Sequence, residues 1–251
     1  MARKCWAYST GKCEGKMSGE HLFSKGLFDG KNVIVSGFMW QETGEEKTIG
    51  LDSITAKILC SHHNNSLSVY DTEASKLSRY IKEIEFLLQK KESTVYKKVI
   101  KKEFAGSNLE QWFKKTAINI FINNNKGALW YNEALADCPP ADIVTSIFDN
   151  TPLLYPKGLY TWQKLGDKYD IKDTAGLMPL YNNKGLYAGA IINIKTLSFL
   201  IWFDGDQEPP IKSPSSVYRH SPGFIIKNPD PDKRKGHIVI TWPNDWAKSN
   251  H

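Results

Sequence analysis

The stretch LCSHHNNS, residues 59–66, brings a thiol, two imidazoles and two carboxamides close together in the chain. A second stretch, SGEHLFSK at residues 18–25, supplies an adjacent carboxylate and imidazole. Two further thiols, Cys5 and Cys13, lie upstream of both stretches. Thiolate and imidazole ligands suit zinc, whereas hard cations prefer carboxylate and amide oxygens. The two stretches therefore predict a zinc site beside a second site, built from oxygen ligands.

The predicted zinc ligands are Cys5, Cys13, Cys60 and His63. Structural zinc takes four such ligands. His63 stands three residues after Cys60, so both side chains can face one ion from a first helical turn, and His62 is the alternative imidazole. Cys5 and Cys13 form a C-x7-C pair, wider than the pairs of common zinc knuckles. We expect zinc to hold the N-terminal loop against the start of a helix.

The second site has the residue types that phosphodiester hydrolysis needs, namely a proton acceptor and oxygen ligands for a divalent cation. Glu20 and Asn64, with Asn65 as the alternative amide, are the predicted ligands of Mg2+ or Mn2+. His21 is the predicted general base, because a neutral imidazole accepts a proton near pH 7. Neighbouring side chains of an extended strand point to opposite faces, so we expect a bend or bulge near Glu20 and His21.

Residues 5 to about 71 resemble the HNH, or ββα-metal, nucleases. They are most similar to the zinc-containing branch that includes the phage recombination endonuclease VII, in which an acidic residue and a histidine precede a C-x-x-C-N motif. The resemblance implies that Glu20 is the acidic metal ligand, His21 the base and Asn64 the amide ligand. The rest of the chain resembles no family that we can name.

The chain departs from this family pattern in three places. Carried over by position, Cys60 and His63 form the second zinc pair, with a histidine where cysteine is common. The first zinc pair is wider than usual. The middle asparagine of the family motif has no clear match among the nearby residues Asp52, Ser53 and Thr55, which leaves the orientation of the base open.

Hydrophobic patterning predicts an α+β fold in three parts. Residues 1–72 form the nuclease-like unit, with a hairpin between 33–40 and 54–59 and a helix just after it. Residues 73–127 form a helical connector, with Asp71 as the N-cap of its first helix and a second helix at 108–121.

Residues 128–251 are rich in β-branched and aromatic runs, which predict a β-rich part that recognises a target or regulates the first part. Four runs are the expected strands: 186–194, 196–203, 224–226 and 237–242. The aromatic side chains between residues 155 and 203 could stack on bases, but core packing explains most of them.

Composition fits a folded protein that contacts a polyanion. The chain has 251 residues and a formal net charge of +6. Its basic residues gather at 90–91, 97–98, 101–102, 114–115 and 233–235, which weakly favours nucleic acid. Four cysteines are too few for a disulfide framework. The first residues have no apolar run of secretory length, and no stretch reaches membrane-spanning length. We therefore expect a cytoplasmic protein without a membrane partner.

The function expected from the sequence is that of a hydrolase, an HNH-type endonuclease acting on double-stranded DNA in restriction or antiviral phage defence. Its cofactors would be structural Zn2+ and catalytic Mg2+ or Mn2+, and its partners a second copy of the chain or a defence-system protein. The alternative is a zinc-stabilised nucleic-acid-binding module without catalysis. A third reading is a toxin or defence effector that stays inactive until it is triggered.

Overall fold

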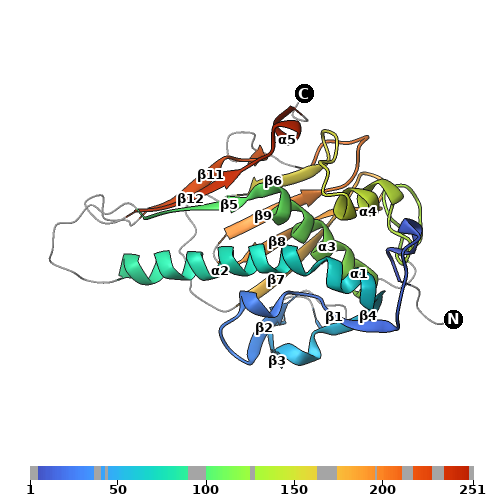
Figure 1. Ribbon diagram of the computed structural model, residues 1–251, viewed down its shortest axis with the longest axis horizontal. Helices are drawn as coiled ribbons and strands as arrows, with labels where there is room; N and C mark the ends of the chain where they lie inside the picture. Colours follow the sequence, from blue (N-terminus) through green and yellow to red (C-terminus); the bar gives the residue numbers. More distant parts are fainter. Residues whose placement is uncertain are drawn as a thin grey trace.

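A computed structural model describes residues 5–36, 41–42, 45–89, 100–124, 128–162, 174–195, 197–210, 217–227 and 235–248. Within these ranges the protein is a mixed α+β structure with three sheets. Helix α3 (Gly106–Asn124) runs through the middle and packs on α2 (Ser68–Gln89) and on strands of the largest sheet (Figure 1). The predicted α+β class is confirmed.

The largest sheet has seven strands in the order β10-β6-β9-β8-β7-β2-β3. Its neighbours are antiparallel except for the parallel pair β2 and β7. The strands are β2 (Asn32–Ser36), β3 (Lys47–Gly50), β6 (Gly158–Trp162), β7 (Thr174–Tyr181), β8 (Tyr187–Ile194), β9 (Leu197–Trp202) and β10 (Val217–Arg219). The central strands β8 and β9 are buried along nearly their whole length, as expected for strands covered on both faces.

Two smaller sheets complete the fold. One has the order β11-β12-β5, formed by β11 (Gly223–Lys227), β12 (Lys235–Thr241) and β5 (Ile100–Ala105). The other is the antiparallel pair of β1 (Met17–His21) and β4 (Thr55–Cys60). The strands expected within 186–242 are therefore present as β8, β9, β11 and β12.

The predicted hairpin between 33–40 and 54–59 is wrong. Strand β4 pairs with β1, whereas β2 joins the large sheet between β3 and β7; residues 37–40 lie outside the described ranges. Sequence pattern identified both strands, but it does not specify a partner when several apolar strands compete. Helix α1 (Ser61–Ser66) follows β4 directly, as expected.

Helix α2 begins at Ser68, so Asp71 is not its N-cap but a first-turn residue whose carboxylate serves another purpose, described below. The predicted helix at 108–121 is confirmed as α3. The remaining helices are α4 (Ala141–Phe148) and α5 (Asn244–Lys248), with short 3-10 turns at Tyr8–Thr10, Lys25–Leu27 and Leu51–Ser53. Within the described residues, none of the helices is both long and apolar enough to span a membrane.

Helix α3 is buried on all sides. Every residue of α3 except Asn108 and Asn123 is buried, although its sequence has polar and charged residues opposite its apolar face. Lys114 and Lys115 are 0 % and 2 % exposed, so this pair is not part of a polyanion-binding surface. Of the other basic pairs, residues 90–91, 97–98 and 233–234 lie outside the described ranges.

The hydrophobic core extends across the predicted domain boundaries at residues 72 and 127. One continuous cluster of buried side chains runs from Cys5 through α2 and α3 to Ile240 in β12. Strand β2, from the predicted nuclease-like unit, pairs with β7 of the C-terminal part. The three-part division itself stays a prediction.

Candidate metal centre and adjoining cavity

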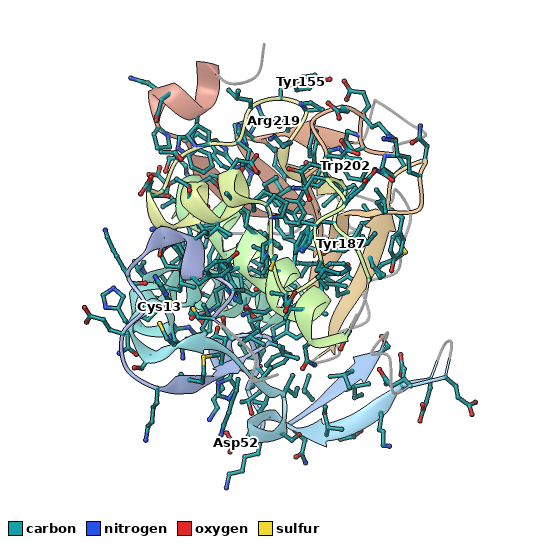
Figure 2. The ribbon with its side chains drawn as sticks, turned by 90° about the vertical axis from the view of Figure 1, so that its right-hand side faces the viewer. Cys13, Asp52, Tyr155, Tyr187, Trp202 and Arg219 are labelled. Atoms are coloured by element: carbon teal, nitrogen blue, oxygen red, sulfur yellow. The ribbon has the colours of Figure 1, made fainter. Side chains whose placement is uncertain are left out.

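Four side chains from three segments meet at one end of the molecule. The ligand atoms of Cys5, Cys13, Cys60 and His63 all lie within 4.8 Å of one another. The His63 Nδ1 atom is 3.3 Å from the Cys5 sulfur, 3.7 Å from that of Cys13 and 3.2 Å from that of Cys60. Cys13 lies at the edge of the molecule (Figure 2). This group could hold a metal ion such as zinc.

The wide spacing of the first two cysteines is explained by the shape of their loop. A 3-10 turn at Tyr8–Thr10 occupies the interval, and Gly11 and Gly15 both have φ of +74°, a backbone conformation that glycine adopts without cost. The loop then docks on α1, where the backbone N–H of His62 donates to the Glu14 carbonyl. The seven residues between Cys5 and Cys13 therefore form a compact loop that brings both sulfurs close to His63.

The imidazole of His63 is oriented by Thr10. The Thr10 hydroxyl donates to the Ala7 carbonyl at 2.9 Å and lies 2.7 Å from Nε2 of His63. A hydroxyl has one proton, so Nε2 of His63 is the donor in the second contact. Nδ1 then carries the lone pair and faces the three sulfurs. Outer partners of this kind fix the tautomer of metal-ligating histidines. His62, the alternative ligand, is exposed.

The three thiols differ in acidity because their surroundings differ. Burial raises the pKa of Cys5 to about 12. Burial acts in the same direction on Cys60, but hydrogen bonds from backbone N–H groups outweigh it and lower the pKa of that thiol. Cys60 therefore ionises first, and a bound cation would be needed to hold all three as thiolates.

A cavity of about 480 Å³ adjoins this cluster and contains the other predicted site residues. It is lined by residues from β1 and the segment that follows it, from α1 and from the N-terminal part of α2. The lining residues are Gly19, Glu20, His21, Ser24, Lys25, Gly26, Asn64, Asn65, Ser68, Asp71, Thr72, Ser75 and Arg79. Glu20, His21 and Asn64 thus share one cavity. The pairing of β1 with β4 is irregular between Ser18 and Gly19, whereas Glu20 and His21 pair in regular register with Ala56 and Thr55. The bulge expected at Glu20 and His21 is therefore not found at these two residues.

Glu20 is buried and already paired. Its Oε1 lies 2.6 Å from Nζ of Lys115 and accepts a hydrogen bond from Asn119 Nδ2 at 3.3 Å. The orientation of the Asn119 amide is fixed because its Oδ1 accepts from the indole N–H of Trp6. Burial raises the pKa of Glu20, and the nearby Lys115 opposes this rise. The carboxylate is therefore positioned by the core helix α3 as well as by its own strand.

Lys115 also reaches the second carboxylate of the cavity. Its Nζ lies 2.7 Å from both Oδ1 and Oδ2 of Asp71. Asp71 also accepts from the hydroxyl of Ser24, which in turn accepts from the indole N–H of Trp112. One ammonium group thus lies between two carboxylates at the floor of the cavity.

His21 is half-buried, and its Nε2 atom has no hydrogen-bond partner among the described residues. Burial lowers the pKa of His21, and the charge of Lys25 adds to this effect. Lys25 itself pairs with the exposed Asp52, which lies near the end of the molecule that carries β2 and β3 (Figure 2). Thr55 stands directly opposite His21 in the strand pairing. The imidazole is therefore neutral near pH 7.

Asn64 and Asn65 both line the cavity but differ in their contacts. The Nδ2 group of Asn64 donates to the Ser18 hydroxyl at 2.9 Å, which leaves its carbonyl oxygen as an acceptor. Asn65 is exposed. Asn64 is therefore the better-ordered of the two amides, and the one that the sequence pattern favoured.

Sequence reasoning missed the part that α3 contributes. Lys115 and Asn119 lie about a hundred residues beyond Glu20 in the chain, and only packing brings them beside it. Lys115 and Asn119 are four residues apart, so they lie on the same face of the helix and can contact the same side chain. This spacing could have indicated a shared polar partner. Asp71 was noticed but given the wrong role.

A second buried charged group lies on the other side of α3. Nζ of Lys114 is 2.9 Å from Oε1 of Glu110, and Nε2 of His220 is 2.7 Å from Oε2. Burial alone would raise the pKa of Glu110, but Lys114 and His220 lower it to about 2. The neighbouring Arg219 donates to the backbone carbonyls of Lys157 and Leu153. Arg219 and His220 therefore both have partners within the protein.

The aromatic side chains of the C-terminal part mostly pack inside. Tyr187 stacks on Phe121 of α3 with ring centroids 3.8 Å apart, and Trp202 is buried in a second core cluster (Figure 2). Tyr155 and Tyr181 are exposed, while Tyr169 lies outside the described residues. Core packing thus accounts for the largest of these side chains.

Comparison of the chain with protein families, with curated proteins and with solved structures found no match.

Proposed function

We propose that the protein is an HNH-type endonuclease that hydrolyses DNA with a divalent metal ion. The observation that carries the proposal is one arrangement: the antiparallel pair β1 and β4 runs straight into α1, with Glu20, His21 and Asn64 around one cavity. The group of three cysteines and one histidine lies at the junction of β4 and α1. Zinc there would hold the N-terminal loop to the same strand and helix that carry the site.

The residues of the cavity fit a hard cation. A carboxylate from Glu20 and a carbonyl oxygen from Asn64 are the donors that Mg2+ or Mn2+ prefers. When bound, such an ion would polarise the phosphate and stabilise the charge on the leaving oxygen. The donor set therefore suits a role in phosphodiester hydrolysis.

In this proposal His21 is the general base. Its lowered pKa keeps the imidazole neutral near pH 7. Nε2 is a buried atom without a hydrogen-bond partner among the described residues, and in this proposal it takes a proton from a water molecule admitted beside it. Arg79, also on the cavity wall, is exposed and charged, so it suits contact with a phosphate group.

The C-terminal β-rich part is assigned target recognition or regulation within the same proposal. Restriction and antiviral defence are the settings that we propose for such a two-part nuclease. The partner would be double-stranded DNA, and a second copy of the chain would supply the second cut of a double-strand break.

A plasmid-cleavage assay with Mg2+ or Mn2+ tests the proposal. We expect metal-dependent nicking or linearisation by the wild type, lost by two orders of magnitude or more in His21→Ala, as for removal of a general base. His237→Ala is the matched control, because His237 lies in β12, outside the cavity. Equal cutting by wild type and His21→Ala would contradict the assignment.

A non-catalytic zinc-stabilised nucleic-acid-binding module is the second candidate. It is favoured by the fact that Glu20 and Asn64 already have protein partners, Lys115 and Ser18. A folded, zinc-loaded wild type that binds plasmid DNA but does not cut it with either metal would favour this module. A nuclease that awaits a trigger would gain activity when its target or partner is added.

A further inference from the structure

Lys115 is the least expected group in the proposed metal site. Its ammonium nitrogen is 2.6 Å from the Glu20 carboxylate and 2.7 Å from the Asp71 carboxylate. Both carboxylates line the cavity, whereas the lysine reaches them from the core helix α3. The side chain of Lys115 is only 2 % exposed. The positive charge is therefore built into the floor of the cavity.

The charge balance of this group is incomplete. Two carboxylates share a single ammonium, so these three groups carry a net negative charge if both carboxylates are ionised. Of the two other cations that line the cavity, Lys25 is paired with Asp52, and Arg79 is exposed. The closed group around Glu110 is different, since one carboxylate there meets Lys114 and also His220. Coulomb attraction makes the first group, but not the second, a place that favours an additional cation.

We propose that Lys115 is a built-in counter-cation that competes with the divalent metal for Glu20, and that Asp71 retains the ammonium when the metal binds. The inference rests on the proposed function, because it takes Glu20 as a metal ligand. It makes Lys115 a positioning residue that sets the metal affinity, and Asp71 part of the same site.

The lysine needs no second position to release Glu20. Nζ of Lys115 contacts both oxygens of Asp71 at 2.7 Å, so it keeps a complete ion pair when Glu20 turns to a metal. Asp71 is in turn held by Ser24, which accepts from Trp112. An ammonium that stays this close to a bound dication repels it, so Lys115 weakens metal binding in the wild type.

The test is Mn2+ binding to the full-length, zinc-loaded protein, measured by calorimetry without DNA. We expect Lys115→Met to bind Mn2+ about tenfold more tightly than the wild type, or better, because the competing charge is gone. Lys115→Arg keeps the charge and should keep the weaker, wild-type affinity. Lys114→Met is the matched control: it removes the neighbouring buried lysine, and its Mn2+ affinity should equal that of the wild type.

Loss of Lys115 leaves two unpaired carboxylates, so the variant is expected to be less stable without metal. Lys115→Gln, which keeps an amide donor, is the second variant, and the melting temperature is the second readout. Mn2+ should raise the melting temperature of both Lys115 variants by several degrees more than that of the wild type. It should give Lys114→Met no such rescue.

The inference is overturned if Mn2+ binds Lys115→Met and Lys115→Gln no more tightly than the wild type, or if both stay unfolded in its presence. It is also overturned if Mn2+ rescues the Lys114 variant equally. The readout is independent of cleavage. Tighter Mn2+ binding by the Lys115 variants, in a protein that does not cut DNA, would support the inference and contradict the nuclease proposal. Metal-dependent DNA cleavage without tighter Mn2+ binding by these variants would support the nuclease proposal and contradict the inference.

Discussion

Lys114 and Lys115 are neighbours in the chain, yet they belong to two different kinds of buried charge group. Lys114 is fully buried and forms an ion pair with Glu110, whose other carboxylate oxygen contacts His220. Lys115 meets Glu20 and Asp71 beneath an open cavity. The first group joins α3 to the C-terminal part, and the second joins α3 to β1 and α2, close to the cluster of three cysteines and one histidine. The charged group around Lys114 is thus enclosed in the core, whereas the carboxylates that pair with Lys115 also line a cavity.

The largest effect is expected from breaking the cluster of Cys5, Cys13, Cys60 and His63. Cys60→Ser removes a ligand from the junction of β4 and α1, and structural zinc contributes on the order of 10 kcal/mol to folding in small zinc domains. We expect loss of most of the structure of the first 70 residues, measured by zinc content and thermal melting.

Cys138→Ser is the control for this prediction, because Cys138 is not one of the clustered ligands. Its zinc content should match the wild type. Wild-type zinc content and melting in Cys60→Ser would show that the cluster holds no structural metal.

The two glutamates provide the next comparison. Glu110→Gln leaves the fully buried Lys114 ammonium without a carboxylate partner, which costs about 3–5 kcal/mol for a buried pair. Glu20→Gln leaves Lys115 paired with Asp71, so its cost should be about 1–2 kcal/mol. Chemical denaturation of the two variants measures the difference. Equal losses in the free energy of unfolding would contradict the expectation that Lys115, unlike Lys114, keeps a carboxylate partner when its glutamate is replaced.

Acid should weaken the closed group in a defined range of pH. The pKa of Glu110 falls from 4.5 to about 2 on folding, so its ionised form stabilises the native state above pH 4.5. This contribution decreases as the pH falls from about 4.5 and is lost below about 2, amounting to roughly 3 kcal/mol. Stability curves of the wild type and Glu110→Gln should therefore converge over this range. Parallel curves would contradict the lowered pKa.

The smallest effect on stability is expected at His21. The side chain is half-buried and Nε2 has no partner in the described structure, so His21→Ala should change the free energy of unfolding by less than about 1 kcal/mol. Thermal melting beside the wild type checks this. A drop of many degrees would give His21 a structural role instead of the proposed catalytic one.

The agreement between sequence and structure is best where the chemistry is local. Cys60 and His63 lie three residues apart at the start of a helix, so their convergence follows from helical geometry. The upstream cysteines could be added because three thiols and an imidazole make a complete ligand set. The strands of the C-terminal half were readable from their β-branched and aromatic runs, since such side chains fit a pleated, buried surface.

The sequence by itself thus determined the α+β class, the convergence of Cys5, Cys13, Cys60 and His63, and the grouping of Glu20, His21 and Asn64 around one cavity. Only the tertiary structure decided that β4 pairs with β1, and that Lys115 and Asn119 come from α3 to meet Glu20. The physical reason is distance along the chain. A spacing of three or four residues fixes geometry through the backbone, whereas a contact between residues a hundred positions apart depends on how the whole core packs.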